Sequence, residues 1–300
     1  MTFLKLFRTT FYNNRITRTF PRKPESYFEK LNLMKRITWI AFICCCFSGG
    51  MSAQTYEQTV RQALSAAEHD SLDQAEELFR QALKISPGDH RNALVYQYIG
   101  QVIETKYWKN PSDVKTVEEI IFNYSKAIEL QPQNRSMLFS RANFYLSMEN
   151  YGKAIHDYTT ILEHDRQNTD ALNRRAFAYY QNREYDKAEN DYNAVLAIKP
   201  SDYASALGKA LVMQKTFRLG EAIKRMEFLV VEHPDRAELY AVRASMYKES
   251  GKMELALVDI SRAIQFEPKN PAYYSQRADI YEAQGKKKMA AADRRKAASR

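Results

Sequence analysis

The stretch TDALNRRAFAYYQNREYDKAENDYNAVLAIKPSD, residues 169–202, decides the fold. Counted from its first residue, Leu172, Ala176 and Tyr179 stand at positions 4, 8 and 11. Intervals of four and three place side chains on one face of an α-helix. The first half of the stretch therefore predicts a helix whose buried face carries a large, a small and an aromatic residue.

The second half repeats this arrangement after a short polar turn at residues 182–184. Ala188, Tyr192 and Val195, at positions 20, 24 and 27, share one helical face, and Pro200 follows where a helix cannot continue. Small residues at positions 8 and 20 let two antiparallel backbones approach closely, while the aromatic residues fill the space beside them. The stretch predicts two helices packed against each other.

The same positions recur along the chain at a spacing of 34 residues. Positions 8 and 20 are alanine in five successive repeats, as Ala142, Ala176, Ala210, Ala244 and Ala278, and as Ala154, Ala188, Ala222, Ala256 and Ala290. A fixed period of this length is typical of a solenoid, in which each repeat packs only on its neighbours. Such a surface suits binding more than catalysis.

This pattern resembles the tetratricopeptide repeat family, whose period is also about 34 residues. The resemblance covers nearly all of the chain after residue 55, in seven repeats: 56–89, 93–134, 135–168, 169–202, 203–236, 237–270 and 271–300. It implies an all-α fold over residues 54–300, a right-handed α-solenoid of stacked helix-turn-helix units, with a binding role and no catalysis.

Two repeats depart from the pattern. The second is eight residues longer, and we expect its first helix to end near Thr105 and a loop to follow over residues 106–115. Thr116 and Glu119 then form a capping box that starts the second helix. Trp108 lies in this insertion, either covering neighbouring helices or exposed as an anchor for a partner. The seventh repeat ends in a basic helix, interpreted as a solvated cap, with a basic docking patch as the alternative.

Arginine at position 7 and aspartate at position 23 occur together in four repeats, as Arg141 and Asp157, Arg175 and Asp191, Arg243 and Asp259, and Arg277 and Asp293. The recurrence predicts a series of partly buried ion pairs, either within each repeat or between neighbouring repeats. The fifth repeat carries Lys209 and Arg225 at these positions, two like charges that predict a softer segment in the stack.

The segment 34–53 has the features of an export signal. Basic residues precede an apolar run over residues 37–47, and small residues follow up to Ala53. Because the run is shorter than the roughly 20 residues that span a bilayer, the order predicts a signal peptide cleaved after Ala53. Residues 1–33 are then an upstream extension that is not native, with Met34 as the true start, although their arginines and threonines also fit a mitochondrial presequence.

Removal of residues 1–53 changes the composition. The whole chain has 45 Lys and Arg against 36 Asp and Glu, whereas the remainder keeps 36 against 34, so the basic balance that favours nucleic-acid binding nearly disappears. Cys44, Cys45 and Cys46 are the three cysteines of the chain, and they leave with the signal, which excludes disulfides from the mature protein. The alternative is an outer-membrane-associated lipoprotein anchored through one of these cysteines.

The sequence offers little support for catalysis. Its five histidines are scattered, and no glycine-rich phosphate loop, nucleophile motif or metal-ligand spacing occurs. The repeats occupy the chain after residue 55, which leaves no length for a catalytic domain. We therefore expect no enzyme activity, no cofactor, no metal and no small-molecule substrate.

In the tetratricopeptide repeat family the first helix of each repeat lines a concave groove. Carried onto this sequence, the resemblance implies a groove lined by ten residues: Phe139, Asn143, Asn173, Arg174, Phe177, Tyr180, Gln181, Leu207, Leu211 and Gln214. The apolar members occupy no framework position, and packing between helices is the alternative role for them. Family members that grip a terminal carboxylate use a set of Lys, Asn and Arg positions of which Asn143 alone is matched, so binding of that type is not expected.

The resemblance implies an interaction scaffold that binds a protein or peptide partner, with no nucleic acid involved. The export signal places it in the periplasm of a bacterium with two membranes. The alternative function is an adaptor subunit of an envelope-assembly or enzyme complex, which would recruit a catalyst without performing chemistry.

Overall fold

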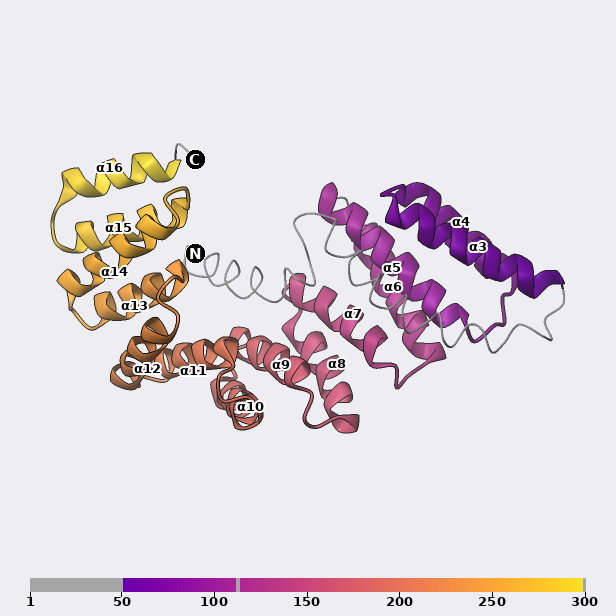
Figure 1. Ribbon diagram of the computed structural model, residues 1–300, viewed down its shortest axis with the longest axis horizontal. Helices are drawn as coiled ribbons and strands as arrows, with labels where there is room; N and C mark the ends of the chain where they lie inside the picture. The colour runs from indigo at the N-terminus through magenta and orange to yellow at the C-terminus, as the bar shows by residue number, and fades with distance from the viewer. Residues whose placement is uncertain (1–50, 112–113, 299–300) are drawn as a thin grey trace. The chain divides into compact units, whose positions relative to one another are not determined.

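The computed structural model describes residues 51–111 and 114–298, and these ranges are built from fourteen α-helices with no strand (Figure 1). The upstream extension, most of the export signal and all three cysteines lie outside the described residues. The first helix of each repeat is α3 (Met51–Glu68), α5 (Asn92–Lys109), α7 (Arg135–Ser147), α9 (Thr169–Gln181), α11 (Tyr203–Lys215), α13 (Ala237–Glu249) or α15 (Pro271–Ala283). The second helix is α4 (Leu72–Ile85), α6 (Val114–Leu130), α8 (Tyr151–His164), α10 (Tyr185–Ile198), α12 (Leu219–Glu232), α14 (Met253–Phe266) or α16 (Lys287–Ala298).

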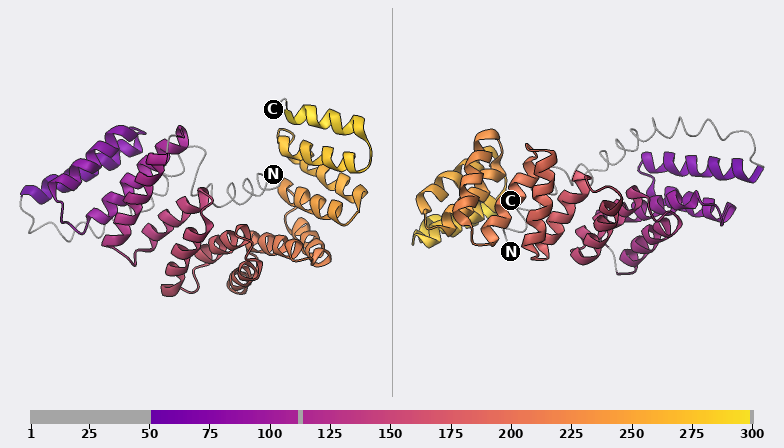
Figure 2. Two further views of the ribbon diagram at one scale, coloured as in Figure 1. Left: turned by 180° about the vertical axis from the view of Figure 1, so that it is seen from behind. Right: turned by 90° about the horizontal axis from the view of Figure 1, so that it is seen from below.

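Most helices that follow one another within one part of the chain pack together. The described chain divides into two compact stacks of helices, which we call the N-terminal stack (residues 51–171) and the C-terminal stack (residues 172–298). Helices α3 to α8 pack in order in the N-terminal stack, and α10 to α16 do so in the C-terminal stack (Figure 2). The prediction of an all-α solenoid of helical repeats is confirmed.

The framework alanines are buried between helices. Alanines at positions 8 and 20 of the third to seventh repeats are between 0% and 2% exposed. The rings of Tyr124, Tyr158 and Tyr192, all at position 24, are also 0% exposed. A small residue therefore alternates with a large one along the second helix, which gives the interdigitated packing that the sequence predicts.

The turn between the two helices of a repeat has one geometry. The residue at position 15 takes a positive φ in six repeats: Asp70, Glu149, Arg183, Phe217, Gly251 and Gly285. The next residue donates its N–H to the carbonyl of position 11, as Glu184 does to Tyr179 at 2.9 Å and Lys252 does to Tyr247 at 2.8 Å. This is a Schellman turn, in which a left-handed residue ends the first helix and satisfies its last carbonyls. Glycine adopts that conformation without strain, whereas Phe217 does not.

The insertion in the second repeat lengthens its helices. Helix α5 continues to Lys109 and α6 begins at Val114, so the predicted loop over residues 106–115 is wrong. Thr116 lies inside α6, and the predicted capping box is therefore wrong as well. The physical reason is a set of charges that supports the extra turn of α5.

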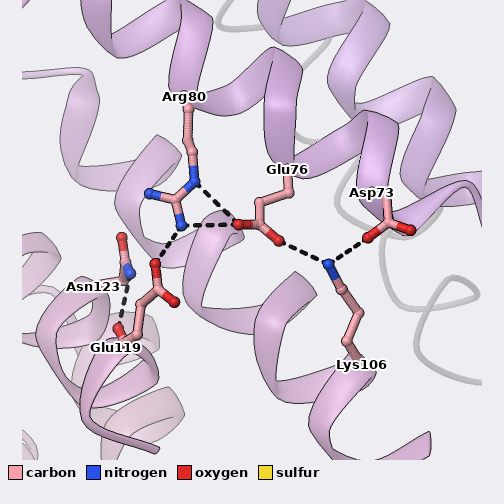
Figure 3. A network of polar contacts seen from close by, with 6 residues as sticks. All are labelled: Asp73, Glu76, Arg80, Lys106, Glu119 and Asn123. Atoms are coloured by element: carbon pink, nitrogen blue, oxygen red, sulfur yellow. Dashed lines mark hydrogen bonds and ion pairs between the residues drawn. The ribbon is translucent and has the colours of Figure 1, made fainter. Parts of the chain in front are cut away.

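Charged residues of α4 hold this extra turn. Lys106 pairs with both Asp73 and Glu76, the latter at 3.1 Å, and Arg80 pairs with Glu76 at 2.8 Å (Figure 3). Arg80 also reaches Glu119 of α6. Exposed ion pairs are individually weak, but several pairs that share partners act together. The insertion therefore ties the second repeat to the first.

The arginine–aspartate pairs form as predicted, and each lies within its own repeat. Arg175 donates from Nε and Nη2 to the two carboxylate oxygens of Asp191, both at 2.8 Å. The same two-point geometry, at 2.7 to 2.9 Å, joins Arg141 to Asp157, Arg243 to Asp259 and Arg277 to Asp293. The aspartate side chains are at most 9% exposed. Ion pairs that are partly buried in this way contribute more to stability than exposed ones do.

The fifth repeat lacks this pair. Lys209 and Arg225 form no ion pair with another residue of the described ranges, and both are partly exposed. Because the stability of a solenoid is roughly a sum of repeat and neighbour terms, we expect amides of residues 207–230 to exchange with solvent before those of residues 172–195. Arg225→Asp gives Lys209 an acidic partner and should slow that exchange by the equivalent of about 1 kcal/mol.

Hydrogen exchange followed by mass spectrometry measures both effects. The matched control is Lys215→Asp, an equal charge change at an exposed residue of the same repeat, which should not slow the exchange of residues 207–230 because it places a carboxylate at the C-terminus of α11. Equal protection of the fourth and fifth repeats in the wild type would show that the ion pairs do not set local stability.

Candidate functional site

The candidate site is the face of the first helices on which the ten groove residues lie. We call it the groove face and define it by positions 2, 5, 6, 9, 12 and 13 of each repeat. Phe139 and Asn143 belong to the N-terminal stack, and the other eight belong to the C-terminal stack. The two stacks are described separately.

In the N-terminal stack, Phe139 and Asn143 both contact Tyr158 of their own repeat. Tyr158 donates its hydroxyl proton to Oδ1 of Asn143 at 2.7 Å, and its ring lies edge-on to Phe139 with the centroids 6.0 Å apart. Asn143 is 7% exposed, whereas Phe139 is half-buried. Asn143 therefore accepts the hydrogen bond of a buried tyrosine hydroxyl, and part of the Phe139 ring stays exposed to solvent.

A second groove-face contact in this stack joins neighbouring repeats. Nε2 of Gln97 in α5 donates to the hydroxyl oxygens of Ser136 and Ser140 in α7, at 3.0 and 2.9 Å. Sequence reasoning missed Gln97, although it stands at position 5 of its repeat, because one amide on a helix face does not reveal a partner on the next repeat. The contact shows that amide side chains connect successive first helices.

In the C-terminal stack, Asn173 is bound to the start of α11. Its Oδ1 accepts from the hydroxyl of Ser205 at 2.6 Å, and its Nδ2 donates to Asp202 at 3.3 Å. Asp202 also accepts from the backbone N–H of Ser205 at 2.9 Å and so caps α11. Asn173 is thus a connector between repeats, and its side chain is 7% exposed.

Gln214 makes the same kind of connection between the fifth and sixth repeats. Its Nε2 donates to Oε2 of Glu249 in α13 at 2.6 Å, and Gln276 of α15 donates in turn to the carbonyl of Ala241 at 2.7 Å. Because a carboxylate only accepts, the amide of Gln214 must turn its nitrogen toward Glu249. Its Oε1 is left buried and has no hydrogen-bond partner among the described residues.

Three apolar groove residues are buried in the stack. Phe177 is 2% exposed, and Leu207 and Leu211 are 0% exposed, so the expectation that these side chains line an open groove is wrong. Helix α11 packs against both α10 and α12, and it is therefore covered on two sides. Packing between helices, the alternative role of the apolar members, is what the structure shows for these three.

Arg174, Tyr180 and Gln181 stay partly exposed on α9. The ring of Tyr180 lies edge-on to Tyr185 with centroids 5.7 Å apart, and burial raises the pKa of its hydroxyl well above the usual value. The hydroxyl is therefore neutral at physiological pH and is able to donate a hydrogen bond. The guanidinium of Arg174, the amide of Gln181 and the ring of Tyr180 are groups that can bind a partner by hydrogen bonding and packing. Their contact with a partner stays a prediction.

Gly208 permits a close contact that sequence reasoning missed. A Cβ atom at this residue would lie 2.3 Å from Cζ of Tyr192, far inside van der Waals contact. The Tyr192 ring is 0% exposed, and its hydroxyl has no hydrogen-bond partner in the ranges that the structure describes. The Tyr192 ring of the fourth repeat thus packs directly against the backbone of the fifth repeat, because residue 208 has no side chain.

Glu104 is a buried acid on the groove face of the second repeat. It is 3% exposed, and it accepts hydrogen bonds from the hydroxyl of Tyr124 at 2.5 Å and from Nε1 of Trp108 at 3.3 Å. Burial raises the pKa of Glu104 to about 7, although both hydrogen bonds act in the opposite direction. Trp108 is 44% exposed, so it covers this acid with one edge and meets solvent with the other.

No group of three or more potential metal ligands occurs among the residues that the structure describes. None of the described helices is both long and apolar enough to cross a membrane.

The comparisons with known proteins agree with the geometry. A family model described as the tetratricopeptide repeat matches residues 169–202. A solved tetratricopeptide repeat protein from Parabacteroides merdae is similar over 82% of this chain and 93% of its own, with 26% identity and a TM-score of 0.72. No curated protein sequence matches.

More distant structures share the fold. PilW, described as a widely conserved type IV pilus biogenesis factor, is 14% identical with a TM-score of 0.55, over 67% of this chain and 90% of its own. A thermophilic tetratricopeptide repeat protein of Thermus thermophilus is also 14% identical with a TM-score of 0.50, over 63% of this chain and 99% of its own.

The contact at Gly208 gives a stability prediction. Gly208→Ala should lower the free energy of unfolding by about 1 to 3 kcal/mol, because the new methyl group overlaps the Tyr192 ring. Gly152→Ala is the control, since nothing lies within 4 Å of the added Cβ, and it should be neutral or slightly stabilising. Urea unfolding measures both. Tyr192→Leu in the Gly208→Ala background should recover some of the loss, and a fully additive double variant would contradict the clash.

Glu104 gives a pH prediction. Its pKa is about 7 in the folded chain against a usual 4.5, so the unfolded chain loses this proton first as the pH rises. The contribution of Glu104 to stability is therefore complete below about pH 4.5 and falls by roughly 2 to 4 kcal/mol on the way to pH 7. Glu104→Gln should remove this loss, which urea unfolding at pH 5 and pH 7.5 would show as a smaller difference than in the wild type.

Glu118→Gln, at an exposed carboxylate of α6, is the control for that measurement and should keep the wild-type difference. An unchanged pH dependence in Glu104→Gln would mean that the buried acid does not titrate in this range.

Proposed function

The chain is a tetratricopeptide repeat protein, and on this premise we propose that it is a non-catalytic scaffold that binds a partner protein or peptide on its groove face. The supporting observation is that the described residues form helix pairs whose first helices are joined on one face. Helix pairs at the 34-residue period account for the described chain, and they join through amide and hydroxyl side chains on one face of the first helices. Proteins of this fold generally act by holding other proteins.

Burial limits which groove-face residues can carry the contact. In the N-terminal stack, Phe139 offers a half-buried aromatic ring beside Asn143. In the C-terminal stack, Arg174, Tyr180 and Gln181 offer charge, aromatic surface and an amide. These groups suit a peptide that presents carbonyl or carboxylate oxygens together with apolar side chains. An adaptor subunit of an envelope-assembly or enzyme complex would use the same face.

The cellular location belongs to the proposal. The order of basic, apolar and small residues over 34–53 supports export to the periplasm, with a lipid anchor at Cys44, Cys45 or Cys46 and mitochondrial import as the alternatives. The source of partners to examine is therefore the cell envelope.

Affinity capture from envelope extract tests the proposal. Arg174→Glu places the opposite charge on the groove face and should reduce recovery of the bound partner about tenfold or more. The matched control, Asn190→Glu, adds a negative charge at an exposed residue of α10 in the same repeat and should leave recovery unchanged. Equal recovery by both variants, with the circular dichroism of each intact, would place partner binding away from the groove face of α9.

A further inference from the structure

The outward face of α12 in the fifth repeat carries large apolar side chains. Phe228 and Val231 are 61% and 78% exposed on this helix, and Phe217, in the turn just before it, is 98% exposed. Glu221 and Lys224 lie between them along the helix and are exposed as well. We call these five residues the α12 stripe.

The α12 stripe is a departure from the repeat pattern. At positions 26 and 29, where the fifth repeat has Phe228 and Val231, other repeats carry small, polar or charged residues: Gln81 and Lys84, Lys126 and Glu129, Thr160 and Glu163, Ala194 and Ala197, and Arg262 and Gln265. The framework needs no large apolar residue at either position. Exposed apolar side chains that gather in one place mark a surface that another molecule covers.

Phe217 adds a second anomaly. Its φ is +60°, at the turn position where the next two repeats have Gly251 and Gly285. A bulky residue in the left-handed region is strained, and the ring of Phe217 is exposed to solvent.

The charges of the α12 stripe suggest what covers it. Two α12 helices can lie antiparallel about a two-fold axis that passes between residues 222 and 223. In that arrangement Phe217 lies opposite Phe228 of the second copy, and Glu221 lies opposite its Lys224. Each contact then occurs twice, as an isologous interface requires. Phe217 of one copy reaches the surface between Phe228 and Val231 of the other, two residues that share one helical face.

The same charges select this register. Neither Glu221 nor Lys224 forms an ion pair with another residue within the described ranges. A shift of the axis to residue 224 would place Lys224 against its own copy, which is unfavourable. Arg218 and Glu227 also come opposite each other in this register, but they already bind Glu189 and Tyr247 of their own chain and do not decide it. Apolar and charged groups therefore agree on one arrangement.

We propose that the α12 stripe is a self-association surface through which two copies of this chain form a two-fold dimer. The contact lies on a second helix, so the dimer is a property separate from partner binding on the groove face. Stable interfaces bury roughly 1,200 to 2,000 Å² in total, and one helix pair provides less, so the dimer forms reversibly and depends on concentration.

Sedimentation velocity of the purified chain over a concentration series tests the proposal. We expect the wild type to pass from monomer to dimer as its concentration rises. Phe228→Ser should weaken the dimer at least about tenfold, because it removes the ring that receives Phe217 of the other copy. Phe122→Ser is the matched control, because Phe122 is 54% exposed on α6, outside the α12 stripe, and its loss should change nothing.

A charge exchange makes the test specific to the register. Glu221→Lys should weaken the dimer, and the double variant with Lys224→Glu should restore it to within about threefold of the wild type. A wild type that stays monomeric at the highest concentration would overturn the proposal, and so would a dimer that Phe228→Ser leaves intact. A double variant as weak as Glu221→Lys alone would exclude the antiparallel register.

Discussion

The close approach of two helices at a pair of alanines is the constraint on which the structure depends. In the fourth repeat, Ala176 and Ala188 are both 0% exposed, as close packing of two helices at small residues requires. The residue before the first alanine, Arg175, then lies within reach of Asp191, and the two form a charge-assisted pair with two hydrogen bonds. Packing thus brings the charges together, and the charges fix the relative rotation of the helices.

The same constraint explains where glycine replaces a larger residue. The tyrosine at position 24 is fully buried in three repeats, and in two of them its ring lies against a glycine of a neighbouring helix. At Gly100 an added Cβ would lie 2.8 Å from the ring of Tyr124, and at Gly208 it would lie 2.3 Å from that of Tyr192. Where the ring approaches most closely the chain has no side chain, so packing selects these glycines and the backbone conformation does not.

The period of the sequence predicted the fold and the arginine–aspartate pairs because it directly reports which residues face the partner helix. It failed where burial depends on several neighbours, since Phe177 occupies no framework position and yet is buried. It also failed where charges lengthen a helix. Lys106 lies beyond the point where the first helix of a 34-residue repeat ends, but its ion pairs with Asp73 and Glu76 of α4 stabilise a further helical turn. Glu104 gave no signal, since a single carboxylate on a helix is ordinarily solvated. Long-range partners of this kind are invisible to a periodicity argument.

The fifth repeat concentrates the departures from the framework, and the physics of a repeat stack explains why one repeat can do so. It lacks the ion pair, places Gly208 on its first helix and exposes Phe217 in a strained turn. Each change costs stability locally, but neighbour terms from the fourth and sixth repeats, which keep their arginine–aspartate pairs, support it from both sides. An interior repeat between two complete ones is therefore the place where a solenoid best tolerates residues selected for contacts with other molecules, since a terminal repeat would have support on one side alone.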